Sequence, residues 1–253
     1  MRLFATARHF LSGLLLLAAL GACAPGPQTG ETADGVYDPY ERQNRKVHNF
    51  NRGLDRAIVR PTSQGYTHII PEDLQNSVGN FATNLGQPSS AVNAVLQGDL
   101  RGAGISTARF VVNSTLGFAG LFDAASDFNI PQHGTDFGET LHVWGVGEGA
   151  YLELPFAGPS TQRDTVGMVV DLFTNPLRYS LDSPEENYGT IAGVASRVGD
   201  RGRFADTIDS ILYDSADSYS QARLIFLQNR RFELGDETST PEIDPFELDT
   251  EGF

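Results

Sequence analysis

Apolar residues recur every three or four positions along much of the chain, which is the spacing of amphipathic α-helices. The first helical segment is predicted to begin at Asp38, where Pro39 and Glu41 complete a capping pattern, and to end at Pro61. Its apolar side chains share one face and are those of Val47, Phe50, Leu54 and Ile58. Such a stripe is typical of a helix that packs against a core.

Further helices are predicted from the same periodicity, from capping residues and from glycine or proline breaks. The first of them starts at Pro71 and ends at Gly86, and the second runs from about Pro88 to Gln97 and is stopped by Gly98. The third extends from an Asp99 cap to Gly117. The later ones are a short helix at Phe137–Val143, a helix capped by Ser160 that ends before Pro176, a helix opened by Ser183-Pro184-Glu185-Glu186, and helices around 204–211 and 219–226. Residues 117–160 are otherwise rich in glycine and are predicted to form loops. The pattern therefore predicts a single all-α domain with glycine-rich loops.

One of these loops, residues 116–122, is unusually apolar for a connection between helices. Gly117 and Gly120 allow a tight bend, and the large side chains around them are those of Leu116, Phe118, Leu121 and Phe122. A hairpin that enters a membrane needs this combination of apolar groups and a bend. The same side chains could instead cover the core of the domain, and the residues alone leave both readings open.

The N-terminus has the composition of a bacterial lipoprotein signal. Arg2 and Arg8 precede an apolar run at 10–20 that is too short to cross a bilayer, as a signal-peptide core is. The string Leu20-Gly21-Ala22-Cys23 then resembles a lipobox. We therefore predict a signal peptide at 1–22, a lipid anchor on Cys23 and a flexible tether at 23–36. Ala24, in place of aspartate, points by resemblance to the sorting rule toward the outer membrane.

Charge and cysteine content narrow the classes of function. The chain has 253 residues, with 18 Lys plus Arg, 32 Asp plus Glu and a formal net charge of −14, so nucleic acid is not an expected partner. The one cysteine excludes an internal disulfide and a cysteine-rich metal site. Residues 235–253 are acidic, contain proline and lack periodicity, so we predict a disordered tail after a folded domain at 37–234.

A search for catalytic chemistry finds only weak patterns. The metal-capable residues His133, Asp136, Glu139 and His142 recur every third position, a spacing that drifts around a helix, and Gly134 and Gly138 lie among them. No Gly-x-Ser-x-Gly nucleophile motif occurs. We therefore predict no catalytic residues, metal site or cofactor. A lipid-anchored phospholipase or other envelope hydrolase remains the alternative, with Ser114, His133 and His142 as its candidate residues.

Several motifs, in order along the chain, resemble the MlaA/VacJ family of outer-membrane lipoproteins. They are Asp38-Pro39 with Glu41, Arg42 and Asn44, His48-Asn49-Phe50-Asn51, Val59-Arg60-Pro61, Leu96-Gln97-Gly98-Asp99, Asn113-Ser114-Thr115-Leu116-Gly117, Gly120-Leu121-Phe122-Asp123 and the stretch 137–164. They lie within residues 37–232, behind the lipobox. His48 departs from the family pattern, in which an apolar residue is expected at this position.

The resemblance implies a ring-like helical protein in the inner leaflet of the outer membrane, with a central amphipathic channel. Such a protein removes misplaced phospholipid from the outer leaflet, passes it to a soluble periplasmic carrier and associates with a trimeric porin. It implies no enzymatic activity and no cofactor. It also makes residues 116–122 a membrane-interface hairpin, with Leu116, Phe118, Leu121 and Phe122 in contact with lipid and with Asn49 and Phe50 as a candidate channel gate. A porin-bound lipoprotein with a purely structural role is a further alternative.

Overall fold

The fold is a ring of helices with one small β-hairpin. The computed structural model describes residues 36–182 and 184–235; the predicted signal peptide, Cys23 and most of the predicted tether and tail lie outside this part. The elements in chain order are α2 (Glu41–Leu54), a π-helical turn η1 (Asp55–Val59), α3 (Arg60–Ile69), α4 (Glu72–Gln97), α5 (Leu100–Thr115), α6 (Ala124–Asp127), α7 (Phe137–Val143), β1 (Tyr151–Leu154), β2 (Gly158–Thr161), α8 (Gln162–Thr174), α9 (Leu177–Ser180), a 3₁₀ turn η2 (Glu185–Asn187), α10 (Tyr188–Arg203), α11 (Ala205–Asp209), a second π-helical turn η3 (Ser210–Asp214) and α12 (Ser218–Glu233).

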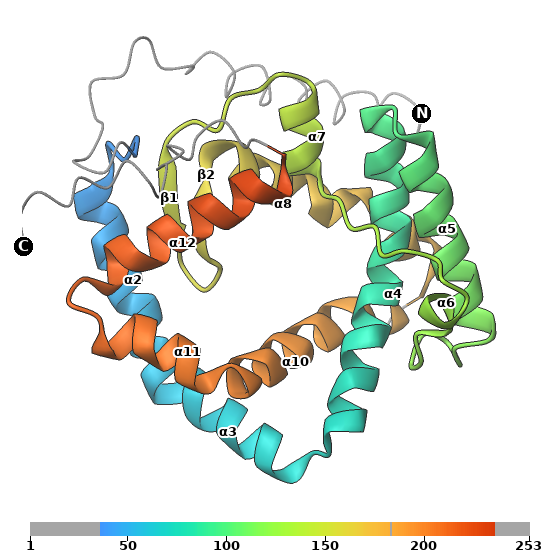
Figure 1. The fold of residues 1–253 in the computed structure, drawn as a ribbon, viewed down its shortest axis with the longest axis horizontal. Coiled ribbons are helices and arrows are strands. Elements are labelled where there is room, and N and C mark those ends of the chain that lie inside the picture. Colours follow the sequence, from blue (N-terminus) through green and yellow to red (C-terminus); the bar gives the residue numbers. More distant parts are fainter. Residues whose placement is uncertain (1–35, 183, 236–253) are drawn as a thin grey trace, which may run out of the picture.

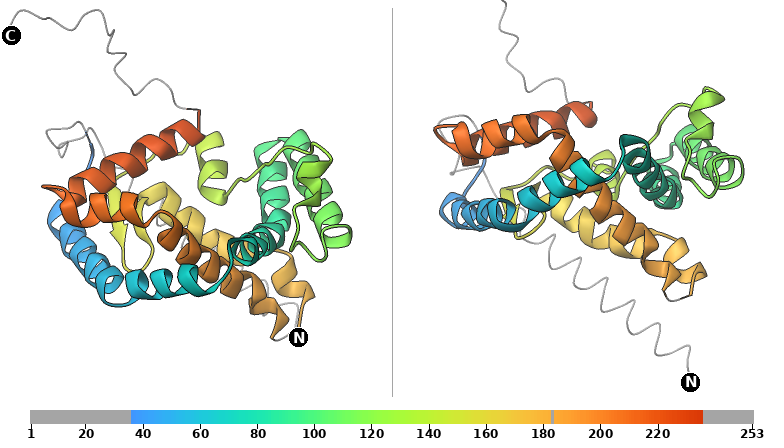
Figure 2. Two further views of the ribbon diagram at one scale, coloured as in Figure 1. Left: turned by 60° about the horizontal axis from the view of Figure 1, so that its bottom comes forward. Right: turned by 90° about the horizontal axis from the view of Figure 1, so that it is seen from below.

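The helices follow one another around the ring and close it between distant parts of the chain. Figure 1 shows α2, α3 and α4 along three sides, with α7, α8 and α12 along the fourth and α5 and α6 outside α4. The two other views show α8 and α10 sloping to one side of the ring (Figure 2). The all-α prediction is confirmed, and the antiparallel pair β1–β2, which joins Tyr151 to Thr161 and Leu154 to Gly158, is its one departure within the described residues.

Two predicted helix ends prove wrong because the chain continues through a proline. Gly86 and Pro88 were expected to separate two helices, but α4 runs unbroken through both of them and ends at Gly98, as predicted, in a left-handed conformation with φ +80°. Pro61 was expected to stop the first helix, but it lies in the first turn of α3, where a missing N–H is tolerated. The π-helical turn η1 lies directly before it.

The predicted caps are only partly correct. The Asp99 side chain accepts a backbone N–H at the start of α5, as predicted. The short helix α7 has the predicted bounds, and its cap is Asp136, which the sequence pattern had not assigned to this role. Ser160 lies in β2, and its neighbour Thr161 caps α8 instead. Asp38 caps no helix: its carboxylate is buried and accepts hydrogen bonds from Arg223, at 2.7 Å, and from Tyr219. The Asp38 carboxylate, which the local pattern assigns to a helix cap, therefore pairs with Arg223, 185 residues further along the chain.

The burial of the first helix is the reverse of the prediction. The expected core stripe is exposed or half-buried, with half of Phe50 and 57% of Ile58 accessible, whereas the residues buried from α2 into η1 are Asn44, His48 and Asp55. The same holds along α4, whose buried positions are Asn84, Gln87, Ser90, Asn93 and Ala94. Helical spacing predicted the faces correctly but not which of them is buried.

A small apolar cluster supports the polar interior on the side of the β-hairpin. Val36, at the end of the predicted tether, is buried with Tyr151, Tyr219 and Leu227. His48, the departure from the family pattern, lies among these residues: its Nε2 is 3.0 Å from the Ser218 hydroxyl, its Nδ1 is 3.4 Å from Glu153, and its ring meets Tyr219 edge-on. An apolar residue at position 48 would leave Glu153 and Ser218 without this contact.

A cluster of ion pairs joins the two π-helical turns. Arg201 of α10 donates to both carboxylate oxygens of Asp55, each at 2.8 Å, and to Asp209 at 2.6 Å. The Tyr213 hydroxyl donates to Asp55 at 2.6 Å. Burial acts to raise the pKa of Asp55, but the hydrogen bonds from Arg201 and Tyr213 outweigh it and hold that pKa below its usual value. The ionised carboxylate thus fixes η1 against α10 and η3.

None of the helices in the described part of the chain is both long enough and apolar enough to span a bilayer.

Alanine substitutions at Gly86, within α4, and at Gly98, at its end, should have opposite effects on the free energy of unfolding. Gly98→Ala should lower the free energy of unfolding by about 1–2 kcal/mol, because a Cβ is strained at a positive φ although nothing lies within 4 Å of it. Gly86→Ala should raise the free energy of unfolding by about 0.5–1 kcal/mol. Alanine fits the helical backbone at this position in the folded state, and it lowers the conformational entropy of the unfolded chain. Denaturant unfolding of the two variants in the same detergent measures both, and an equal loss in both would contradict the continuous α4.

Candidate functional site

The chain after α5 forms an exposed apolar loop, residues 116–122, which we call the apolar loop. Leu116, Phe118 and Phe122 expose 65%, 73% and 61% of their surface, while Leu121 is partly buried. Val111 of α5 and Phe128 after α6 are also exposed and extend the apolar surface on either side of the loop in sequence. The structure therefore presents three of the four predicted lipid contacts to the outside instead of packing them into the core.

The bend of the apolar loop depends on its two glycines. Phe118, Ala119 and Gly120 all have positive φ angles, of 55°, 62° and 93°. A Cβ on Gly120 would lie 2.6 Å from the Asn84 side chain, and one on Gly117 would collide with the carbonyl oxygen of Phe122. Glycine is thus required for the loop to fold back on itself and to pack against α4.

A buried ion pair supports the apolar loop from below. The Arg109 side chain is 2% exposed, and its guanidinium donates to both oxygens of Asp123, at 2.7 and 2.8 Å, and to the carbonyl of Ile130 at 2.6 Å. Asn113 donates to Asp123 at 3.0 Å and accepts the backbone N–H of Ala125 at 2.7 Å. These contacts tie α5 to both ends of the chain segment that follows the loop.

Two asparagines of α4 complete this support. The Asn84 side chain donates to the Ser114 hydroxyl at 3.0 Å, and the Asn80 side chain donates to the carbonyl of Leu121 at 3.4 Å. Desolvation raises the pKa of Asp123, but hydrogen bonds from Ser126, Asn113 and Arg109 outweigh it, so the pKa of this carboxyl lies below its usual value. The polar support therefore stays charged at neutral pH and holds an exposed apolar tip in one position.

The predicted channel gate lies elsewhere. Asn49 and Phe50 are exposed on α2, which Figure 1 places across the ring from α5 and α6. The Phe50 ring meets Phe156, at the turn between β1 and β2, edge-on at 5.4 Å. The structure thus does not bring Asn49 and Phe50 together with the apolar loop.

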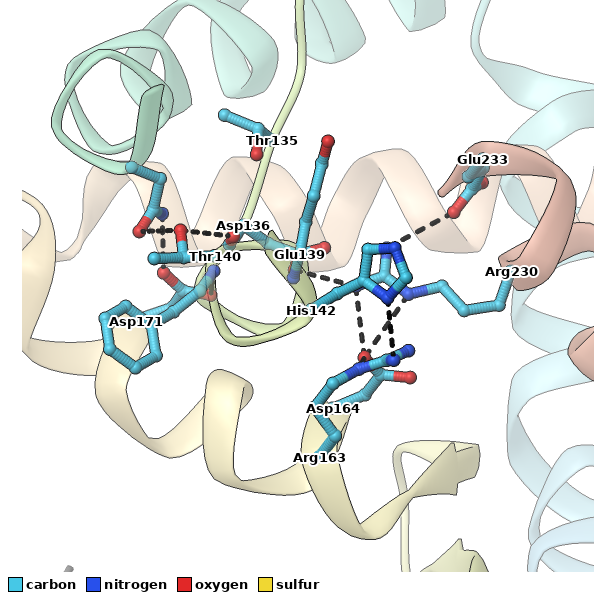
Figure 3. A network of polar contacts seen from close by, with 12 residues as sticks. Thr135, Asp136, Glu139, Thr140, His142, Arg163, Asp164, Asp171, Arg230 and Glu233 are labelled. Atoms are coloured by element: carbon cyan, nitrogen blue, oxygen red, sulfur yellow. Dashed lines mark hydrogen bonds and ion pairs between the residues drawn. The ribbon is translucent and has the colours of Figure 1, made fainter. Parts of the chain in front are cut away.

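The four metal-capable residues of the sequence are separated by their partners. His133 lies 3.6 Å from Asp99, and His142 lies 3.3 Å from Arg163. Asp136 caps α7 and pairs at 2.7 Å with Arg230, which also reaches Asp164 at 3.1 Å (Figure 3). No group of three or more His, Cys, Asp or Glu within the described residues is placed to hold a metal ion. This network instead joins α7, α8 and α12.

Sequence reasoning missed the support of the apolar loop. Asn113 and Asp123 belong to motifs of the family resemblance, but their pairing with each other and with Arg109 depends on the fold of the loop between them. The one local signal was Asp123 before Ala-Ala-Ser, a cap pattern that the structure realises at α6.

The fold and this site define a class of protein: a helical ring whose buried side chains are mostly polar or small, which exposes many large apolar side chains and holds an apolar loop on a polar support. A sequence model described as MlaA lipoprotein matches residues 36–233. Among relatives, the chain is 33% identical over 240 residues to the intermembrane phospholipid transport system lipoprotein MlaA of Escherichia coli K12, covering 93% of this chain and 92% of that protein. It is 29% identical over 234 residues to the Haemophilus influenzae protein of the same name, covering 90% and 91%.

A solved structure agrees with the sequence comparisons. It is described as the structural basis for maintenance of bacterial outer membrane lipid asymmetry, and it matches with a TM-score of 0.67 and 32% identity, covering 78% of this chain and 98% of the solved one. The chain belongs to the MlaA lipoprotein family.

The buried pair under the apolar loop predicts a pH-dependent loss of stability. Asp123→Asn should lower the free energy of unfolding at neutral pH by about 3 kcal/mol, because it leaves the Arg109 guanidinium buried without its counter-charge. Since the folded pKa of Asp123 is depressed, its contribution is present above the unfolded value near 4 and is lost as the pH falls through the folded value. The difference from wild type should therefore narrow below about pH 4.

Asp127→Asn is the matched control, because Asp127 is exposed on the same short helix. It should change the free energy of unfolding by less than about 0.5 kcal/mol at either pH. Denaturant titrations at pH 7 and pH 3.5 measure both variants. A pH-independent effect of Asp123→Asn would show that the pair carries no charge-dependent stability.

Proposed function

We propose that this protein is a lipid-anchored component of the outer membrane that moves phospholipid between membranes. In this proposal Cys23 carries the acyl chains, and the ring lies in the inner leaflet on the periplasmic side. The ring removes mislocalised phospholipid from the outer leaflet through an amphipathic channel and hands it to a soluble periplasmic carrier. The outcome is the maintenance of lipid asymmetry.

The observation that carries this proposal is the inverted burial of the ring. The fully buried side chains are mostly polar or small, whereas large apolar side chains are exposed on nearly every helix. In water such a surface is unfavourable, at roughly 25 cal/mol for each Å² of apolar area, but in hydrocarbon that cost disappears. A polar interior also lowers the cost of passing a lipid headgroup, which in hydrocarbon would lose its hydration.

The apolar loop is proposed as the part of the ring that enters the acyl-chain region. Leu116, Phe118 and Phe122 supply exposed apolar surface, and the Arg109–Asp123 pair keeps the loop rigid. Leu121 is assigned to the same contact because it is only partly buried. Irregular backbone is tolerated at membrane depth when its polar groups are satisfied within the protein, and the backbone N–H groups of residues 119–122 donate to carbonyls of the loop and of α5.

The further parts of the proposal rest on the relatives. The E. coli and H. influenzae proteins are named for intermembrane phospholipid transport, which supports phospholipid as the cargo. The trimeric porin and the periplasmic carrier are proposed as partners by the same resemblance. Asn49 and Phe50 are kept as a proposed gate, with the Phe50–Phe156 contact as the movable element.

The alternative of a phospholipase lacks a catalytic arrangement in the described residues. A serine nucleophile needs a base within hydrogen-bonding reach. The Ser114 hydroxyl accepts from Asn84, while His133 faces Asp99 and His142 faces Arg163. These three candidate residues therefore belong to three different polar networks, which favours transport over hydrolysis.

The apolar loop predicts a loss of function without a loss of fold. Phe118→Asp with Phe122→Asp should raise outer-leaflet phospholipid to the level of a deletion strain, because each aspartate costs roughly 2.5–3.5 kcal/mol at membrane depth. The measurement is the phospholipid that externally added phospholipase can reach in intact cells that carry each variant.

Phe118→Leu with Phe122→Leu is the control, since it keeps the loop apolar and should preserve asymmetry. Both pairs should give wild-type protein levels and near-ultraviolet circular dichroism. Wild-type asymmetry in the aspartate variant would remove the assignment of the apolar loop to the membrane.

A further inference from the structure

Helix α2 has three distinct faces, and the third is a stripe of unpaired cations. Its buried face carries Asn44 and His48, and its apolar face carries Val47 and Phe50. The remaining face follows the spacing i, i+4, i+7 and i+11 through Arg42, Lys46, Asn49 and Gly53, and Arg56 follows it in the adjoining turn η1; all five residues are exposed. We call Arg42, Lys46 and Arg56 the basic face.

The basic face is exceptional in this chain. Six of the 18 Lys and Arg residues lie between positions 41 and 60, whereas the whole chain has a net charge of −14. Two neighbouring cations form ion pairs within the protein: Arg45 pairs with Glu41 and Asp217, and Arg60 pairs with Asp209. Within the described residues, Arg42 and Lys46 form no ion pair, and Arg56 contacts only the face of the Tyr213 ring, at 4.8 Å. Its charges are therefore available to an external anion.

The basic face adjoins the apolar face on the exposed half of α2. At 100° per residue, Arg42 and Lys46 lie beside the stripe of Val47, Phe50 and Leu54, while the polar buried face lies behind both. A helix with this cross-section lies in the interface of a bilayer, with its apolar face toward the acyl chains and its cations at the level of the phosphates. Figure 1 places α2 at the outer edge of the ring, where it can meet such a surface.

We propose that the basic face of α2 binds the phosphates of anionic phospholipid headgroups in the bilayer that holds the ring. The proposal rests on the membrane attachment proposed above and adds a preference for lipid charge. The contact would fix the depth and rotation of the ring in the bilayer. An acidic protein is the competing occupant, but the adjoining apolar stripe favours a bilayer, because a headgroup layer satisfies both faces together.

The single lysine of the chain allows a direct test. Lys46 is the only lysine, so an uncharged amine-reactive reagent reports on this position alone. The mature lipidated protein, with Arg101→Lys as an internal reference, is placed in nanodiscs of phosphatidylcholine or of phosphatidylcholine with phosphatidylglycerol. Arg101 is exposed and has no ion pair within the described part of the chain, as is true of Lys46. Mass spectrometry then gives the rate of modification at both lysines in the same molecule.

We expect phosphatidylglycerol to slow the modification of Lys46 by about fivefold, because a basic residue near an anionic surface gains about 1 kcal/mol. The rate of modification at residue 101 should not change. High salt should abolish the protection. Arg42→Gln with Arg56→Gln should weaken it, whereas removing Arg197, which is exposed on α10, should not.

Other outcomes would overturn the proposal. Equal rates at Lys46 in the two lipids, or equal slowing at both lysines, would show that α2 has no specific contact with anionic headgroups. Protection of Lys46 in cells but in neither nanodisc would assign the face to a protein partner. These results would leave the transport function intact, because that function fails only if the protein does not insert or if its loss leaves asymmetry unchanged.

Discussion

Four arginines that are removed from solvent determine how this ring is held together. Arg109, Arg163, Arg201 and Arg223 are buried, and each lies within 3.4 Å of an aspartate. A buried guanidinium without a counter-charge is strongly destabilising, so a pair between two elements constrains both of them. Arg163 and Asp164 are neighbours within α8, but the other three pairs connect different parts of the chain. Asp38 with Arg223 joins the N-terminal segment to α12, and Asp55 with Arg201 joins η1 to α10. These two charge pairs thus connect residues far apart in sequence, and a small apolar cluster lies beside Arg223 and α12.

This arrangement leaves many of the large apolar side chains exposed and few of them fully buried. A water-soluble domain gains its stability from burying such side chains, whereas in a bilayer the surrounding lipid is as apolar as they are. Polar contacts then specify the fold, because in hydrocarbon the groups that make them have no water to turn to. The apolar loop on its Arg109–Asp123 support and the three-faced α2 follow the same rule. In the membrane setting that we propose, the polar side is satisfied inside the protein or at the headgroups, and the apolar side faces the acyl chains.

The sequence predicted the helices better than it predicted their orientation. A period of 3.6 residues is the same whether a face meets a core or lipid, so Phe50 and Ile58 were assigned to a core that Asn44 and Asp55 occupy. Local capping chemistry predicted the Asp99 cap correctly but misassigned Asp38, whose carboxylate pairs with Arg223, 185 residues away. Within the site, the apolar character and glycines of residues 116–122 were visible in sequence. The support by Arg109 was not, because an isolated arginine in a helical pattern gives no sign of its burial or of its partner.

The central claim is that the apolar exterior of the ring contacts hydrocarbon, and the single tryptophan offers a direct measurement. With Trp144→Phe and Phe118→Trp, the one tryptophan of the chain stands at the tip of the apolar loop. In bilayers of lipids brominated at successive acyl positions, its fluorescence should be quenched by bromine within the acyl region and protected from aqueous iodide. Quenching by iodide, with no effect of brominated acyl chains, would place the loop in water and contradict the account.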